Sequence, residues 1–500
     1  MKKILSLIGI GTIILFITSC EKILEQYPKD QIASETFWQT EKDVNLGLAG
    51  VYNTMLSRRA MNFGRCLWDG LSDIGWGYSD FNRGLIEATG AVGGPYTDCY
   101  QGISRCNVFL SNIDKATSVS QSVKDIAKGE VLFLRADFYF TLTEFYGGVP
   151  LYIKPPTIDE SLVAKSTKEE VVTQILADLD QAISYLPDVV YTGHAVKASA
   201  LALKAQVLMH NQRWAEAADA ANQIILSGKF SLYNNYTNLF LRTGQDNNPE
   251  IIFSVRYLNP NAGNYAANSA PEMLWAHGHS LTPTQEFVDM FECTDGLPIT
   301  TSPLYNQATY KLNRDPRMLA TIIDFPDYTA KGTPIGQTGE TWAYFTGQTN
   351  AYSVEKMVDW SFMPVSWATE SDQDYIRFRY ATVLLIYAEC KNEASGPDQS
   401  VYNAINAIRA RPTVNMPPLT AGLDKAAMRE KIRHERAVEL GMEGVRYWDI
   451  KRWKTAETVI PLLKIPTGEP RVFNPAKNYL WPFPQSEMDV NPKLVQNPGY

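Results

Sequence analysis

The sequence predicts a mostly α-helical protein. Between Val131 and Tyr146, apolar residues recur at steps of three and four, which places them on one face of a helix. Gly147-Gly148 and Pro150 follow, a combination that ends helices. The 500 residues are enough to bury a substantial core between packed helices. Further helical patterns cover Thr167–Leu186, Val196–His210, Trp214–Ser227, Tyr375–Glu393, Val401–Arg411 and Lys425–Leu440.

The helix over Thr167–Leu186 has two possible starts. Ser166 with Glu169, and Thr167 with Glu170, each form the Ser/Thr-x-x-Glu pattern of a capping box. Pro187 ends the helix. The pattern predicts the element and leaves open which of the two residues caps it.

The predicted helices Val196–His210 and Trp214–Ser227 are rich in alanine and are joined by Asn211-Gln212-Arg213. Small side chains let two helices approach closely. A helix pair of this size matches the tetratricopeptide repeat of roughly 34 residues. We therefore expect paired helices stacked side by side.

The N-terminus has the pattern of a bacterial lipoprotein signal. Met1-Lys2-Lys3 is basic, Ile4–Ile17 is apolar, and Thr18-Ser19 precede Cys20. We expect residues 1–19 to be removed and Cys20 to carry the lipid, so that the protein is attached to a membrane without spanning it. An uncleaved anchor and an ordinary cleaved signal are the alternatives.

Three stretches lack sustained helical periodicity. They cover about residues 61–100, 258–295 and 328–369, and are rich in glycine, asparagine, threonine and aromatic residues. Six of the eleven tryptophans fall within them. Long irregular segments in a folded domain are often functional, so we expect the ligand-binding residues there.

Composition and motifs argue against several functions. With 46 basic and 54 acidic residues, the net charge of −8 offers no surface for nucleic acid. The HExxH, GxSxG and Walker patterns are absent from the sequence. His277-Gly278-His279 is a weak candidate metal pair without a third ligand. We therefore expect no catalytic residue, metal or other cofactor, although no pattern excludes a glycosidase-type pair of carboxylates.

Five cysteines remain besides Cys20, and they contain no CxxC pattern. Buried thiols are the expected state. A disulfide from Cys66 to Cys99 or Cys106 is the alternative in an exported protein. The five are Cys66, Cys99, Cys106, Cys293 and Cys390.

Short motifs along nearly the whole chain carry a family resemblance. They are the lipobox ending at Cys20, Thr36-Phe37-Trp38, Leu48–Tyr52, Phe133–Ala136, Tyr146–Leu151, Asn248–Phe253, Asp315-Pro316-Arg317, Arg379–Glu389, Glu435–Asp449, Trp481–Pro484 and Gln496–Tyr500. With these motifs in this order, the chain resembles the SusD/RagB family of Bacteroidota outer-membrane nutrient-binding lipoproteins.

The resemblance implies one domain over residues 20–500. Its fold would be a right-handed α-superhelix of four tetratricopeptide-like helix pairs with loop-rich ligand-binding insertions. Such proteins are not enzymes; they capture glycans at the cell surface and deliver them to a SusC-like TonB-dependent transporter. Capture of peptides, as in some branches of the family, is the alternative. A glycoside hydrolase on a helical scaffold is a weaker one.

The expected glycan contacts follow from sugar chemistry together with the resemblance. A sugar ring stacks its C–H face on an aromatic side chain, and its hydroxyl groups need polar partners. The stretch Leu67–Tyr78 contains both kinds of residue. The expected contacts in the first irregular segment are Arg65, Trp68, Asp73, Trp76 and Tyr78, and those in the second are Tyr265, Trp275 and His279.

Charged residues recur on one face of a helix drawn through Glu435, Leu440 and Glu443. Steps of three and four align Arg436, Glu439 and Glu443, with Arg446 just beyond. A carboxylate site is one interpretation. The favoured one is an ion-pair network that docks this helix and the Tyr447-Trp448 turn. Arg135 and Asp137, within an apolar helix, are likewise expected to be paired structural charges.

Overall fold

The computed structural model describes residues 37–56, 61–77, 85–258, 264–265, 280–331, 352–362, 370–463 and 471–500. The predicted signal sequence and Cys20 lie outside these ranges. Within them, every helix is too short or too polar to cross a membrane.

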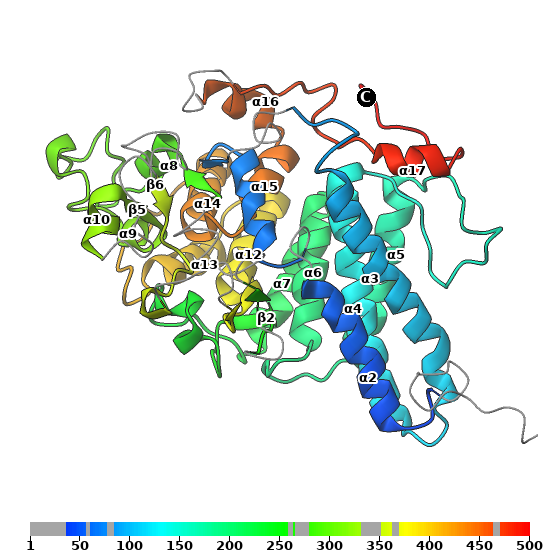
Figure 1. Ribbon diagram of the computed structural model, residues 1–500. Helices are drawn as coiled ribbons and strands as arrows, with labels where there is room; N and C mark the ends of the chain where they lie inside the picture. The colour runs from blue at the N-terminus through cyan, green and yellow to red at the C-terminus, as the bar shows by residue number, and fades with distance from the viewer. Residues whose placement is uncertain are drawn as a thin grey trace, which may run out of the picture.

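The first half of the chain forms a layer of long helices (Figure 1). From α3 to α7, each helix packs on the next one in sequence, as expected for stacked helix pairs. α2 packs on α3 and α4. The bounds are α2 Glu41–Tyr52, α3 Gly93–Asn112, α4 Gln121–Tyr146, α5 Lys168–Tyr185, α6 Lys197–His210 and α7 Trp214–Leu226.

Hydrogen bonds at the start of α5 show which of the two possible residues caps the helix. The Thr167 hydroxyl accepts the backbone N–H of Glu170 at 3.2 Å. In return, the Glu170 carboxylate accepts the backbone N–H of Thr167 at 2.8 Å. This reciprocal pair satisfies two N–H groups that a helix start leaves without partners. Thr167 is therefore the cap, and not Ser166.

The second half of the chain adds a further group of helices. α12 packs on α7, α13 and α14, and so joins the two halves. Their bounds are α12 Tyr380–Ser395, α13 Gln399–Arg409, α14 Lys425–Leu440, α15 Arg446–Arg452, α16 Ala456–Val459 and α17 Gln485–Val490.

The helix predicted from Tyr375 begins five residues later. Tyr375–Arg379 instead forms strand β8, which pairs antiparallel with β2, Ile251–Val255. Both strands are buried along their whole length. Aromatic and branched side chains favour such a buried strand, and a short apolar run does not by itself distinguish strand from helix.

Short elements gather beside α14, on the side of the molecule away from α2 (Figure 1). The strands there form two-stranded antiparallel pairs. The bounds of the remaining strands and α-helices, and of the 3-10 helix η3, are η3 Phe63–Leu71, β1 Gly75–Trp76, β3 Asn264–Tyr265, β4 Thr282–Pro283, α8 Gln285–Met290, α9 Arg317–Thr321, β5 Ile322–Asp324, α10 Phe325–Ala330, β6 Tyr352–Val354 and β7 Glu370–Ser371.

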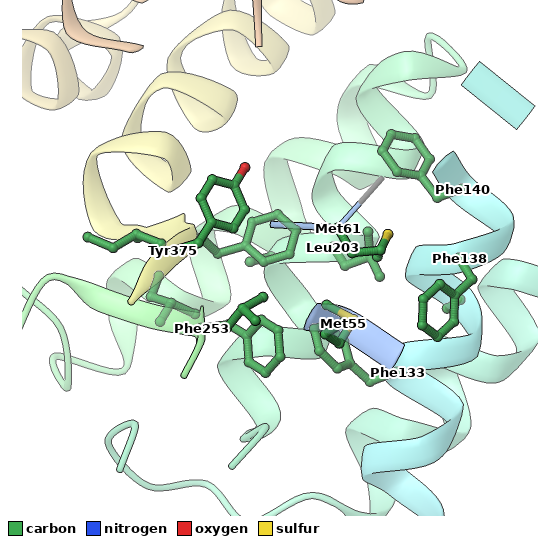
Figure 2. Close-up of a cluster of buried hydrophobic side chains, with 14 of the residues drawn as sticks. Met55, Met61, Phe133, Phe138, Phe140, Leu203, Phe253 and Tyr375 are labelled. Atoms are coloured by element: carbon green, nitrogen blue, oxygen red, sulfur yellow. The ribbon is translucent and has the colours of Figure 1, made fainter. Parts of the chain in front are cut away.

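Phenylalanines of α4 anchor the hydrophobic core. Figure 2 shows Phe133, Phe138 and Phe140 among side chains from α6 and from strands β2 and β8. Phe133 meets Phe253 edge to face at 4.8 Å. Gly102 of α3 packs on the same helix, where an added Cβ would lie 2.4 Å from the Phe138 ring. Only glycine lets α3 approach α4 this closely.

The described cysteines are free thiols, and the buried charges Arg135 and Asp137 of α4 are paired. All five described cysteines are free and buried, which confirms the expected thiols and excludes the Cys66 disulfide in this structure. Arg135 forms a bidentate pair with Asp178 of α5, both distances being 2.7 Å. Asp137 accepts from Arg377 of β8 at 2.7 Å. Arg135 and Asp137 are thus paired structural charges, as predicted, and each pairs with another element.

A cluster of buried ion pairs surrounds α14, and we call it the α14 charge cluster. The Glu439 carboxylate accepts from Arg379 at 2.7 Å, from Arg411 at 2.9 Å and from Arg317 at 2.9 Å. Glu443 accepts from Arg379 at 2.7 Å and from Lys356 at 2.6 Å. The ion-pair interpretation of this helix is therefore confirmed.

The electrostatics of Glu439 reflect this surrounding charge. Burial acts to raise its pKa, but the guanidinium groups of Arg411, Arg379 and Arg317 together hold the pKa well below the ordinary value of 4.5. A carboxyl group whose pKa is lowered in the folded state stabilises the fold above its unfolded pKa. That contribution is lost as the pH falls toward the folded value.

We expect Glu439→Gln to lower the free energy of unfolding by about 3 kcal/mol, because three buried arginines would lose the carboxylate that neutralises part of their positive charge. Urea denaturation of the purified protein measures this loss. Glu430→Gln is the matched control on the same helix, since its side chain is 70% exposed, and we expect it to have a much smaller effect. The difference between wild type and Glu439→Gln should shrink below pH 4.5. Equal stability of the two variants would contradict the cluster's role.

Candidate functional site

The segment that carries Trp76 is held by the turn after α14. Asp69, at the end of η3, accepts the backbone N–H groups of Gly444 and Arg446, each at 2.9 Å. Asp73 accepts two hydrogen bonds from the Arg446 guanidinium, both at 2.8 Å. Burial outweighs the two amide contacts of Asp69 and raises its pKa to about 7. Both carboxyl groups are therefore engaged in positioning the segment.

Arg471 holds the same segment from the C-terminal part of the chain. Its guanidinium donates to the carbonyl oxygens of Ser72 at 2.7 Å, Gly75 at 2.9 Å and Gly70 at 3.0 Å. The side chain is buried, which lowers its pKa to about 10. One planar side chain thus fixes three backbone positions in the seven residues before Trp76, a geometry that a lysine could not reproduce.

The first irregular stretch joins the second through a short strand pair. Trp76 of β1 lies opposite Thr282 of β4, and Gly75 lies opposite Pro283. The Thr284 backbone N–H donates to the carbonyl oxygen of Ile74 at 3.0 Å. Its hydroxyl donates to the carbonyl oxygen of Asp73 at 2.9 Å. The segment is therefore held from three directions.

The third irregular stretch meets the second. β6 packs beside β4, and the Tyr352 hydroxyl donates to Gln285 of α8 at 2.9 Å. The backbone of β3, which includes Tyr265, pairs with that of β7. Strand β4 therefore lies between β1 of the first stretch and β6 of the third, and links the three stretches.

Three of the predicted contacts have other roles. Trp68 is 5% exposed and packs edge to face against Phe145 at 4.8 Å and Trp448 at 5.1 Å. Arg65 is buried, with its guanidinium 4.8 Å from the Trp68 ring centre. Asp73 is paired with Arg446. The expectation that these side chains contact ligand is corrected: each is buried and supports the segment from within.

Trp76 is half-buried at the edge of this region. Tyr78, Trp275 and His279 lie outside the described residues, as does the side chain of Tyr265, and so does His277 of the weak metal pair. Among the described residues, no group of three metal-binding side chains is present.

Sequence reasoning missed Arg471 and the role of Arg446. Arg446 was grouped with the charges of α14, whereas its side chain pairs with Asp73, 373 positions earlier. Arg471 belongs to no local pattern, and its partners are backbone carbonyl groups, which leave no trace in side-chain spacing. No signal in a single sequence points to either contact.

Comparisons with known proteins agree with this architecture. One SusD-like protein of Formosa agariphila is 26% identical to the chain, and the alignment covers 100% of both proteins. A second SusD-like protein of the same organism is 28% identical, and the alignment covers 99% of this chain and 98% of the relative. A solved SusD-like carbohydrate binding protein from Bacteroides fragilis has a TM-score of 0.81 and 27% identity. That comparison covers 92% of this chain and all of the relative.

Two family models match the sequence itself. One, described as starch-binding and associating with the outer membrane, matches residues 76–209. The other, described as the SusD family, matches residues 249–500, which is half of the chain. With the helical fold and the full-length relatives, these matches show that the chain belongs to the SusD family.

Proposed function

We propose that this protein is a lipid-anchored cell-surface binding protein that captures oligosaccharide or polysaccharide and delivers it to a TonB-dependent transporter in the outer membrane. The single observation that carries the proposal is the fixed segment Asp69–Trp76, which ends in a half-buried tryptophan where the first and second irregular stretches meet. The carbohydrate-binding relative and the outer-membrane family description support the ligand class and the location.

A fixed aromatic ring suits sugar binding. Stacking on a sugar needs a flat apolar face, and a loop ordered before the ligand arrives avoids the entropy cost of ordering it during binding. Arg471, Arg446 and the β1–β4 pair supply this order. We propose Trp76 as the central contact, and we keep Tyr78, Tyr265, Trp275 and His279 as proposed contacts.

The carboxyl groups near Trp76 favour binding over hydrolysis. A glycosidase needs one carboxyl group that donates a proton and a second that acts as base or nucleophile. Asp73 is held by Arg446, and Asp69 is buried against two backbone amides. Neither is available to a bound sugar.

Purified protein should therefore release no reducing ends from a glycan that it binds, and release that disappears with a carboxylate variant would assign an enzyme instead.

Trp76→Ala should weaken glycan binding by about thirtyfold, or about 2 kcal/mol, because it removes the central stacking surface. A glycan array identifies the ligand and titration calorimetry measures the affinity. Trp214→Ala is the matched control, since Trp214 is a half-buried tryptophan on α7, and it should leave affinity unchanged. Unchanged affinity with a large fall in Tm for Trp76→Ala would make Trp76 a packing residue. Binding of a peptide pool in place of glycans would favour the peptide-capturing alternative.

Cys20→Ala should release the protein from the membrane while leaving its fold intact, because the proposed lipid has no other acceptor near the N-terminus. Fractionation and labelling with a fatty acid measure attachment, and far-UV circular dichroism measures the helical content. Cys66→Ala is the control that keeps the anchor, as Cys66 is buried in the folded domain. Label retained on the Cys20 variant would contradict the anchor.

A further inference from the structure

A cavity of about 340 Å³ lies away from the Trp76 segment, between the first half of α3, the loop over residues 150–162, and α17. Figure 1 places α17 beside the end of the long-helix layer. None of the residues that line this cavity belongs to η3, β1 or β4.

Tyrosine rings form one side of the cavity. The ring centres of Tyr96 and Tyr100 are 4.6 Å apart with planes at 49°, and those of Tyr100 and Tyr152 are 6.1 Å apart at 76°. The Tyr100 hydroxyl donates to the Pro150 carbonyl oxygen at 2.7 Å, and the Tyr152 hydroxyl donates to that of Ser161 at 2.6 Å. These bonds hold the rings at an angle to one another, as an aromatic corner.

Glu487 of α17 lines the same cavity. Its side chain is half-buried, and within the described part of the chain its carboxylate has neither an ion pair nor a hydrogen bond. Burial raises its pKa. After burial itself, the Glu487 charge is the largest influence that raises the pKa of Tyr96 and of Tyr152, so the carboxylate acts on both phenols. A partly desolvated carboxylate of this kind is stabilised by a cation.

The helix α3 supplies the polar side of the cavity. Thr97, Gln101 and Ser104 follow one another at helical spacing, line the cavity and are exposed. Hydroxyl and amide groups of this kind both donate and accept hydrogen bonds. A ligand that complements the tyrosine rings, Glu487 and the polar side chains of α3 carries both a positive charge and several hydroxyl groups.

We propose that this cavity binds a sugar unit carrying an ammonium group, that is, an amino sugar. The ammonium group lies between the Glu487 carboxylate and the tyrosine faces, which attract cations. The sugar hydroxyl groups face Thr97, Gln101 and Ser104. The proposal rests on the proposed function for the glycan class only, since it uses no residue of the Trp76 segment.

Titration with a β-1,4-linked glucosamine hexasaccharide tests the proposal, with the N-acetylated hexasaccharide and cellohexaose as uncharged controls. We expect wild type to bind the charged oligomer about tenfold more tightly than either control, and Glu487→Gln to remove that preference. Asp489→Asn is the matched control, because it removes one charge from an exposed position of the same helix. It should keep the preference.

Trp76→Ala separates this cavity from the proposed glycan site. Under the proposal, that variant retains the preference for the charged oligomer even if its affinity for other glycans falls. Equal binding of all three oligomers by wild type, or an unchanged preference in Glu487→Gln, would overturn the proposal. If trilysine binds as tightly as the glucosamine oligomer and with the same dependence on Glu487, the cavity recognises a cation alone, and the proposal that its ligand is a sugar is overturned. Unchanged glycan binding in Trp76→Ala would count against the proposed function alone.

Discussion

The buried carboxylate of Glu439 is the constraint on which the rest of the structure depends. Removing one carboxylate and three guanidinium groups from water costs several kcal/mol per ion, and the cost is offset only when every group has partners. Arg317 comes from α9, Arg379 from the end of β8, and Arg411 from the residues after α13. Segments more than 120 residues apart must therefore be in place together before this cluster is satisfied.

Charge pairing continues from this cluster to the segment that carries Trp76. Arg436 of α14 pairs with Asp449 of α15 at 2.9 Å, and the turn between these helices presents the Gly444 and Arg446 amides to Asp69. Gly444 has a φ of +80°, and an added Cβ would lie 2.2 Å from the Arg65 carbonyl oxygen. Only glycine fits there. The conformation of the Trp76 segment thus depends on helices from the C-terminal half of the chain.

The carboxyl groups in the two regions differ in burial and in their partners. Asp69 and Asp73 are fully engaged by backbone amides and by Arg446, so they shape the segment without offering a charge to a ligand. The cavity beside α17 has a different arrangement, because the half-buried Glu487 carboxyl group lines it together with aromatic rings. Two regions of one scaffold therefore differ in chemistry: the proposed stacking contact Trp76 stands on a segment whose carboxyl groups are engaged, whereas a carboxyl group itself lines the cavity beside α17.

Local patterns in the sequence determined the helices. The bounds of α14 agree with its predicted range, and those of α5, α6 and α7 do so within one residue. Glu439 on α14 and Glu443 in the turn after it form ion pairs, as predicted. Helical periodicity and capping are properties of neighbouring residues, so one sequence is enough to predict them. Tertiary structure decided the rest. It placed β8 where a helix was expected, buried Trp68, and brought Arg471 to the carbonyl groups before Trp76. These outcomes depend on contacts between residues far apart in sequence, which local spacing does not encode.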